Sequence, residues 1–362
     1  MAHTTQEGLL VPLVSPKEQY QHKMANEDND KDCHYYSYYL GIDIGTQGLT
    51  CLLTDADLHV VATGEASYGF VPNSPAGVYE QYTTDWQAAL RTATEQVHQQ
   101  FVAKHNSNAL KIAAIGISGQ MHGEVLLTKA GKVLEPVRLW CDGRNAETAA
   151  QLTQALQTKC PQRMTAVRFL WTAQHQPDRA AATHRFTTPA GWLAYSLTGK
   201  VVLGIGDAAG MFPVVGDAYN AEKMVIYNDL LHQHASCKDK NIQDMLPDIC
   251  VAGQDAGSVT VAGAQLLAGL LGPNSTNADL VAASLVGIPV ASAEGDQVAA
   301  LAGSLVGKAG TAACSFGTSV CANVVADLHK PRFQGVHAAI DHFCAADGQP
   351  IHSKLSVALL TD

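Results

Sequence analysis

The chain has 362 residues, a length that predicts about two domains, and 47% of its residues are hydrophobic. This composition, rich in Ala and Gly, favours an α/β enzyme and excludes a disordered or fibrous protein. The 33 acidic residues outnumber the 23 basic ones and give a net charge of −10, which argues against general nucleic-acid binding and against an anionic membrane surface. A local site can still bind a phosphorylated ligand through backbone donors.

The 9 cysteines are scattered along the chain, with no C-x-x-C pair. An odd number of scattered cysteines, several of them in apolar runs, predicts reduced, buried thiols in an intracellular protein. No stretch is long and apolar enough to span a membrane, and the first residues lack the apolar core of a signal peptide. We therefore expect a cytoplasmic protein with no membrane partner.

Residues 1–36 are polar and acidic without periodicity, so we expect a disordered tail. The pattern then changes to three short apolar runs separated by turns, followed by a long helix and a buried strand. The predicted strands are Tyr38–Asp43, Leu49–Thr54, His59–Ala66 and Leu110–Ser118, and the helix begins with Thr84 or Asp85 as its N-cap. This βββαβ order predicts three antiparallel strands at one side of a mixed sheet, with helices outside it.

Residues 139–250 carry amphipathic helices, among them "RNAETAAQLTQALQ" and "PAGWLAYSLTGK", and Gly199 is typical of a helix C-cap. The small, apolar segment Ala256–Leu271 predicts a helix packed tightly against the sheet. The stretch "VGIPVASAEGDQVAALAGSLVG" that follows predicts a strand, a turn and a helix.

The segment Ala312–Val325, "AACSFGTSVCANVV", repeats the format of the first hairpin: an apolar strand, a Gly-Thr turn and a second apolar strand. This internal repeat predicts two sheets of similar topology that face each other. We expect one domain over residues 37–305 and an incomplete second domain over residues 306–362, because no αβα portion follows the second hairpin.

Two Gly-Thr hairpins, one in each half of a duplicated fold, can close on a nucleotide from both sides, because glycine lets backbone N–H groups approach phosphate oxygens. The candidate phosphate-binding residues are Gly45, Thr46, Gln47, Gly317, Thr318 and Ser319. Asp43, at the tip of the first strand, is a candidate ligand for Mg²⁺, which needs few carboxylates. For one such hairpin alone, an ordinary turn with a capping aspartate is the favoured explanation; two copies favour nucleotide binding.

Asp296 follows a predicted strand and Gly295 at the start of a helix, where it is either an N-cap or a general base that takes a proton from an attacking hydroxyl. Gln120, Met121 and His122 lie between glycines after a parallel strand, where open α/β sheets bind ligands. Asp142, Arg144 and Asp207 are further candidates for substrate contacts, although turn acids and a surface arginine explain them equally well. With Asp296 they complete the predicted substrate-binding set.

These motifs together resemble those of the FGGY carbohydrate kinases, an actin–hexokinase-like family. "LGIDIGTQGLT", "GISGQMHGE", "LWCDGRN", "GDAAGMF", "LPDICVAGQDAG", "EGDQVAALAG" and "SFGTSV" occur in the family's order between about residues 38 and 325. The resemblance implies an α/β, actin/hexokinase-like (ribonuclease H-like) mixed-sheet domain with helices on both faces and a truncated second domain. It also implies that Asp296 is the catalytic base and that the two Gly-Thr turns are phosphate loops.

The implied function is ATP-dependent, Mg²⁺-dependent phosphorylation of a small sugar. Met121 and His122 resemble the pair that touches the ketose in xylulokinases, whereas glycerol kinases have an Arg-Glu pair there. Two departures from the family pattern are Arg168 in place of a lysine and the missing aspartate at the start of "TPAGWLAYSLTG". The alternatives are a truncated, non-catalytic pseudokinase or sugar-binding fragment and an actin-like ATPase; the sugar's identity and a homodimeric state stay open.

Overall fold

The structure is a computed structural model that describes residues 37–108, 110–251, 253–273, 278–304, 312–316, 320–324, 338–340 and 356–358. The expected tail at 1–36 and most of the expected second domain lie outside these ranges. So do Gly317, Thr318 and Ser319, the predicted second phosphate-binding residues. Among the described residues, no helix is long and apolar enough to cross a membrane.

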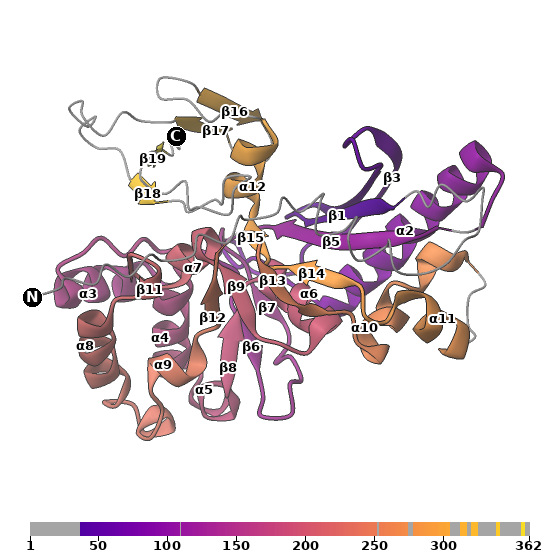
Figure 1. Ribbon diagram of the computed structural model, residues 1–362. Coiled ribbons are helices and arrows are strands. Elements are labelled where there is room, and N and C mark those ends of the chain that lie inside the picture. The colour runs from indigo at the N-terminus through magenta and orange to yellow at the C-terminus, as the bar shows by residue number, and fades with distance from the viewer. Residues whose placement is uncertain are drawn as a thin grey trace, which may run out of the picture.

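The central mixed sheet has the order β13-β14-β5-β1-β2-β3, and the short strand β15 pairs with β5 beside this path. Its strands are β1 (Tyr38–Ile44), β2 (Gly48–Thr54), β3 (Val60–Ser67), β5 (Ile112–Gly119), β13 (Asp255–Ser258), β14 (Pro289–Ala291) and β15 (Glu294–Gly295). Strands β1, β2 and β3 are antiparallel, whereas β5 is parallel to β1, β14 and β15. The predicted sheet is therefore confirmed (Figure 1).

The sheet's first strands alternate between a buried and a more exposed face, as the period of two requires. In β1, Leu40, Ile42 and Ile44 are buried and point toward the layer formed by α2 (Thr83–His105) and α6 (Pro189–Thr198). Those two helices contact each other through the rings of Trp86 and Trp192. The opposite face carries Gly41 and Asp43 of β1 and is covered in part by α12 (Asp296–Gly303).

The N-terminus of α2 differs from the prediction. The N-cap is Tyr82, with no side-chain cap, rather than Thr84 or Asp85. Instead, Thr83 uses its N–H (3.0 Å) and its hydroxyl (2.5 Å) to bind the Glu135 carboxylate. A distant carboxylate thus satisfies the first orphan donors of the helix, which a local cap would otherwise have done.

A second group of helices lies at the end of the molecule away from α2 (Figure 1). It comprises α3 (Ala146–Leu156), α4 (Thr165–His175), α5 (Pro177–Ala182), α8 (Ala221–Leu231), η1 (Ala235–Cys237) and α9 (Ile242–Met245). The short strands that join it to the sheet domain are β4 (Glu80–Gln81), β6 (Val125–Leu127), β7 (Val137–Arg138), β8 (Arg185–Thr187), β9 (Val202–Gly204), β10 (Val214–Val215), β11 (Ala218–Tyr219) and β12 (Asp248–Cys250).

The predicted helices at α3 and α6 are confirmed, and Gly199 ends α6 with a left-handed φ of 74°. The segment Ala256–Leu271 includes a helix, as predicted, but it begins inside β13 and contains two short helices, α10 (Val261–Leu266) and η2 (Ala268–Leu271). Helix α10 packs on α6 and α2, and η2 packs on α2. The helix α11 (Ala278–Leu285) follows them.

After α12, the expected second hairpin is present as β16 (Ala312–Phe316) and β17 (Val320–Val324), paired antiparallel from Ala312↔Val324 to Phe316↔Val320. Helix α12 contacts both of these strands. A further antiparallel pair is formed by β18 (Ala338–Ile340) and β19 (Ser356–Ala358). The helix α7 (Ile205–Met211), which carries a predicted site residue, lies between β9 and β10 in the chain.

Candidate active site

Three adjacent strands end at the same edge of the sheet and bring candidate acids together. The pairing places Ser118 of β5 opposite Asp43 of β1 and also opposite Glu294 of β15. The Ser118 hydroxyl donates a hydrogen bond to Asp43 Oδ1 at 2.6 Å. Gly295 then ends β15 and caps α12, of which Asp296 is the first residue. Asp43 and Asp296, 253 positions apart in sequence (296 − 43), therefore lie at one site.

Asp296 is placed so that it can accept a proton near neutral pH. Burial raises the pKa of its carboxyl to about 7, and the nearby negative charge of Asp43 adds to this effect. The backbone N–H of Gln297 donates to Asp296 Oδ1 at 2.8 Å and opposes the shift only in part. A carboxylate with this pKa can act as a general base at pH 7.

His122 is held as a neutral hydrogen-bond acceptor. Its Nδ1 lies 3.0 Å from the carbonyl oxygen of Gly210, which can only accept, so Nδ1 carries the proton and Nε2 carries a lone pair. Burial, followed by the positive charges of Arg163 and Arg168, lowers the pKa of His122 to about 3. The residue also has a left-handed φ of 66°, and such backbone strain is concentrated at functional sites.

Met121 is seated between two glycines that come from distant parts of the chain. A Cβ at Gly295 would overlap the Met121 side chain, with Sδ only 2.7 Å away. A Cβ at Gly210 would lie 3.2 Å from Met121 Cε and 2.8 Å from His122 Nδ1. Because glycine has no side chain, Gly210 and Gly295 leave the space that the Met121 and His122 side chains occupy.

The turn between β1 and β2 is held by side chains rather than by its own backbone alone. The Tyr68 hydroxyl donates a hydrogen shared between the carbonyl oxygens of Gly45 (2.6 Å) and Gly48 (3.0 Å). The Trp140 indole N–H donates to Thr46 Oγ1 at 3.0 Å. Gln47 is exposed at the tip. Tyr68 and Trp140 were not predicted from the sequence, because no motif marks a side chain that reaches back to a turn from elsewhere.

Gln120 is buried and supports this turn, and its predicted contact with a substrate stays a prediction. The residue is 1% exposed, and its Nε2 donates to the Gly45 carbonyl and to Gln81 Oε1, both at 3.1 Å. Its Oε1 accepts from the Thr46 hydroxyl at 3.3 Å. Gln81 completes the network by donating to the Thr46 carbonyl at 2.8 Å and accepting from Trp86 Nε1 at 3.0 Å.

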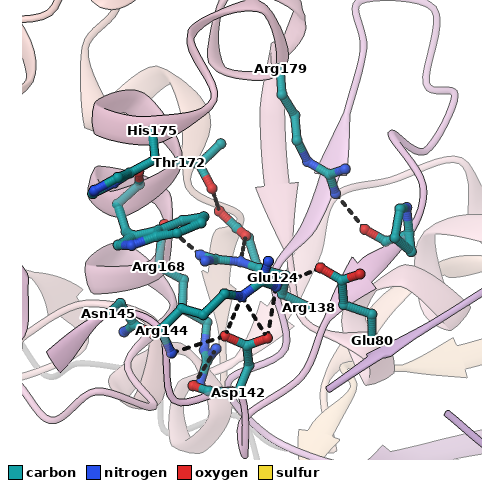
Figure 2. Close-up of polar contacts among 12 residues, drawn as sticks. Glu80, Glu124, Arg138, Asp142, Arg144, Asn145, Arg168, Thr172, His175 and Arg179 are labelled. Carbon is teal, nitrogen blue, oxygen red and sulfur yellow. Dashed lines mark hydrogen bonds and ion pairs between the residues drawn. The ribbon is translucent and has the colours of Figure 1, made fainter. Parts of the chain in front are cut away.

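Asp142 and Arg144 form an ion pair with each other (Figure 2). Arg144 Nε lies 2.9 Å from Asp142 Oδ1 and its Nη2 lies 2.7 Å from Oδ2, while Nη2 also reaches Glu80 at 2.5 Å. The backbone N–H of Tyr79 donates to the same carboxylate at 3.1 Å. Burial opposes the charged form of Asp142, but these hydrogen bonds and the arginine charges outweigh it and lower its pKa.

Behind this pair lies a buried ionic cluster that sequence reasoning missed (Figure 2). Glu124 accepts from Arg138 Nε and from the Thr172 hydroxyl, both at 2.8 Å, and the Arg138 guanidinium lies 4.3 Å from the centre of the Trp171 ring. Arg168 donates to the carbonyl oxygens of Trp140 and Asp142. The available signal was a charged residue in each of two apolar runs, "HGEVLL" and "PVRLW".

Asp207 lies on α7 and is fully buried. Its Oδ2 accepts from the Thr188 hydroxyl at 2.6 Å, and its backbone N–H donates to Glu294 Oε2 at 3.0 Å. Burial raises the pKa of Asp207 to about 8, the Thr188 bond opposes this shift, and the charge of Asp296 adds to it. The Asp207 carboxyl has no exposed surface in this conformation, and its substrate contact stays a prediction.

A cavity of about 590 Å³ opens on the α12 side of the sheet, next to the site. It shares Asp43, Ser118 and Glu294 with the site and is floored by glycines 41 and 116. The described part of the chain holds no group of three or more His, Cys, Asp or Glu side chains that could hold a metal ion. Asp43 is a single, partly exposed carboxylate, and one of its oxygens accepts a hydrogen bond from Ser118. Such a carboxylate suits an ion such as Mg²⁺, which keeps most of its waters.

The fold is of the actin/hexokinase-like class, a mixed sheet with helices on both faces. Residues 38–303 match the family model described as "FGGY family of carbohydrate kinases, N-terminal domain". The chain therefore belongs to the FGGY family of carbohydrate kinases, as the sequence motifs predicted.

Relatives and solved structures agree with this assignment. The xylulose kinase of Haemophilus influenzae is 31% identical over 234 residues, which are 61% of this chain and 45% of that protein. The Escherichia coli xylulose kinase is 27% identical over 87% of this chain and 59% of its own length. The crystal structure of a xylulose kinase from Brucella ovis matches with a TM-score of 0.63 and 26% identity over 85% of this chain and 57% of that one. The chain thus spans about half the length of the relatives that it matches.

Proposed function

We propose that this chain carries the sugar-binding and catalytic part of a kinase that phosphorylates a small sugar with ATP, a ketose of the xylulose type being favoured. The observation that carries the proposal is the pairing of Asp296 with Asp43 at one sheet edge, next to the Met121–His122 loop. Membership of a carbohydrate kinase family supports the reaction class, and the relatives named xylulose kinases support the choice of ketose.

In this proposal each accessible residue has one task. Asp296 takes the proton from a sugar hydroxyl as its oxygen attacks the terminal phosphorus of ATP, and ADP leaves from the opposite side. His122, whose Nε2 carries a lone pair, accepts a hydrogen bond from another sugar hydroxyl and fixes the ring or chain of the sugar. Met121 supplies an apolar wall between Gly210 and Gly295.

The hairpin turns are proposed to hold the nucleotide. Gly45, Thr46 and Gln47 contribute the first phosphate loop, and Gly317, Thr318 and Ser319, outside the described residues, contribute the second. Asp43 is the carboxylate that would hold Mg²⁺, which neutralises phosphate charge when it is bound. Residues 37–305 then form the sugar-binding domain, and residues from 306 onward begin the nucleotide-binding domain.

A coupled assay of ADP release with Mg·ATP and a panel of D-xylulose, D-ribulose and glycerol tests the proposal. In a protein that also carries a complete nucleotide-binding domain, we expect turnover with a ketose and a loss of about 10²- to 10⁴-fold in Asp296→Asn, the contribution of a general base. Calorimetric titration of D-xylulose should give the same affinity for both proteins, because the substitution keeps the side chain's size. Sugar binding without any turnover by that longer protein would favour the non-catalytic alternative. The absence of both sugar binding and turnover would refute the proposal.

A further inference from the structure

The helix α7 stands between the two parts of the site that the proposed reaction uses. Its residue Gly210 provides the carbonyl that fixes the His122 ring, at 3.0 Å from Nδ1. Its residue Asp207 binds Glu294 through the backbone N–H, at 3.0 Å, and Glu294 precedes Asp296 by two positions on β15 and α12. A shift of α7 would therefore displace both the sugar-orienting histidine and the proposed base.

The Asp207 side chain fixes α7 in place. Its Oδ2 accepts from the Thr188 hydroxyl at 2.6 Å, and that hydroxyl is also the N-cap of α6, accepting from Gly191 N–H at 3.1 Å. Thr188 can donate only one proton, and Asp207 receives it. The buried carboxyl thus connects α7 to the start of α6, a helix that packs on β1, β5 and β15.

The opposite side of this connection is a close fit between Gly204 and Glu294. Gly204 caps α7 with an ordinary φ of −64°, and its N–H donates to the Ala293 carbonyl at 2.7 Å. A Cβ at this position would overlap Glu294 Oε1. The Glu294 carboxylate therefore fills the space that a side chain at Gly204 would take. This close contact holds the start of α7 against β15.

We propose that Asp207 is a positioning residue rather than a sugar ligand: by joining Thr188 and Glu294 across α7, it makes His122 and Asp296 face the same space. The proposal rests on the proposed sugar-binding function. Its basis is geometric, since Asp207 has no exposed surface and both of its contacts lead to elements of the site. The other ionisable groups that face Asp207 are Asp296 and Tyr219.

Two substitutions in the full chain separate the effect of the Thr188–Asp207 hydrogen bond from the effect of a negative charge on Asp207. Asp207→Ala removes the acceptor for Thr188, whereas Asp207→Asn retains an oxygen there. Calorimetric titration should show D-xylulose affinity about 10- to 100-fold weaker in the Ala variant, the loss expected when His122 no longer makes its hydrogen bond to the sugar, and within about 3-fold of normal in the Asn variant. The stoichiometry of binding reports the folded fraction, so a merely structural defect would lower that number without changing the affinity.

A second measurement needs no sugar. The imidazole resonance of His122, identified by its absence from His122→Asn, should show no titration between pH 5 and 8 in the unsubstituted chain, because burial and the charges of Arg163 and Arg168 keep the ring neutral. In Asp207→Ala the ring should titrate within that range, and in Asp207→Asn it should not. If the unsubstituted chain does not bind sugar, the proposed function fails. The titration experiment still tests whether Asp207 holds His122 in place.

Gly204→Ala provides an independent test if Asp207→Ala does not fold, because it displaces Glu294 from the other side of the same connection. As in Asp207→Ala, sugar binding should be weaker and His122 should titrate between pH 5 and 8. The proposal would be overturned if, in both Asp207→Ala and Gly204→Ala, His122 showed no titration between pH 5 and 8 and the sugar affinity were unchanged. Equal losses in Asp207→Asn and Asp207→Ala would do the same, since they would point to a role of the negative charge.

Discussion

Asp142, Asp207 and Asp296 are all acids of the site motifs, and their surroundings give them different properties. Arg144 and the Tyr79 N–H keep Asp142 charged, whereas burial without a cation raises the pKa of Asp207 to about 8. Only Asp296 combines a raised pKa, about 7, with partial exposure. The residue type alone does not separate a base from a support; the groups that surround it do.

The pKa of Asp296 predicts how the proposed reaction depends on pH. A general base works in its ionised form, so turnover should fall about tenfold for each unit of pH below about 7 and level off above it. The rate at saturating sugar and Mg·ATP, measured from pH 5.5 to 9, gives this profile. A rate that stays flat down to pH 5.5 would show that proton removal by Asp296 does not limit turnover.

Gly295 should be sensitive to the smallest substitution. In Gly295→Ala the new methyl group would overlap Met121, so we expect D-xylulose affinity to fall by about 10-fold or more, as for other small displacements of a binding group. The matched control is Gly303→Ala in the same helix, where no atom lies within 4 Å of the added Cβ. Calorimetry of both variants decides the matter: similar affinities would mean that the Met121 loop moves without loss of binding.

The sequence predicted which residues gather at the site but not which of them are accessible. Asp43, Met121, His122 and Asp296 have partly exposed side chains, whereas Gln120, Asp142 and Asp207 are at most 1% exposed. Motif spacing locates a residue at the end of a strand. It does not show which distant group covers that residue, and here the partners of the buried residues come from 2 to 87 positions away.

At the scale of elements, the buried pair Glu124–Arg138 joins β7 to the loop that follows His122. Its side chains are 0% and 2% exposed, and both partners have further hydrogen bonds. Removing one member leaves the other charge buried without its partner, so Arg138→Met should lower the free energy of unfolding by about 3–5 kcal/mol.

The matched control for this pair is Arg91→Met, which removes an ion pair with Glu95 on the surface of α2, where the two side chains are 33% and 24% exposed, and an exposed hydrogen bond to the Pro273 carbonyl. Solvent weakens such a pair, so the expected loss is about 0–1 kcal/mol. Urea unfolding followed by circular dichroism measures both variants. Equal losses would mean that water reaches the Glu124–Arg138 pair.

The element order was predictable because it depends on local patterns. The strands β1 and β2 and the helix α2 were predicted correctly from the spacing of their apolar residues. The antiparallel pairing of β16 with β17 was also predicted correctly. The prediction failed where tertiary contacts replace local signals. Glu135 takes the place of a local N-cap on α2, and the small residues of α10 approach another helix, since a Cβ at Gly263 would overlap Leu197 backbone.

At the scale of the whole molecule, the sheet brings together residues from both ends of the matched domain. Strand β15 pairs with β5 and thereby carries Asp296 to Asp43, so the complete order from residue 38 to residue 303 is needed to form the site. The motifs were a sound guide to the class of fold, because they are spread over the chain in a fixed order. They could not predict the ionic cluster in Figure 2, whose members belong to none of the repeated hairpins.

Two buried acids should make the stability of the whole chain depend on pH. An aspartate titrates near 3.8 in the unfolded chain, whereas Asp207 and Asp296 titrate near 8 and 7 in the folded one. Between pH 4 and 8 the folded state therefore holds more protons, and the stability that these groups contribute at low pH is lost as the pH rises. His122, whose folded pKa is lowered to about 3, acts in the opposite direction between pH 3 and 6.5.

Comparison with Asp207→Asn isolates one acid from these opposing effects. The stability of the variant relative to the unsubstituted chain should rise by up to about 1.4 kcal/mol for each unit of pH between 5 and 8, because the amide never acquires the buried charge. Above pH 8 the difference should stay constant, since Asp207 is then ionised in both folded and unfolded chains. Urea unfolding at pH 5, 7 and 9 measures the difference directly. A difference that does not change with pH would mean that Asp207 ionises in the folded protein as readily as in the unfolded one, which requires a cation or water beside its carboxyl.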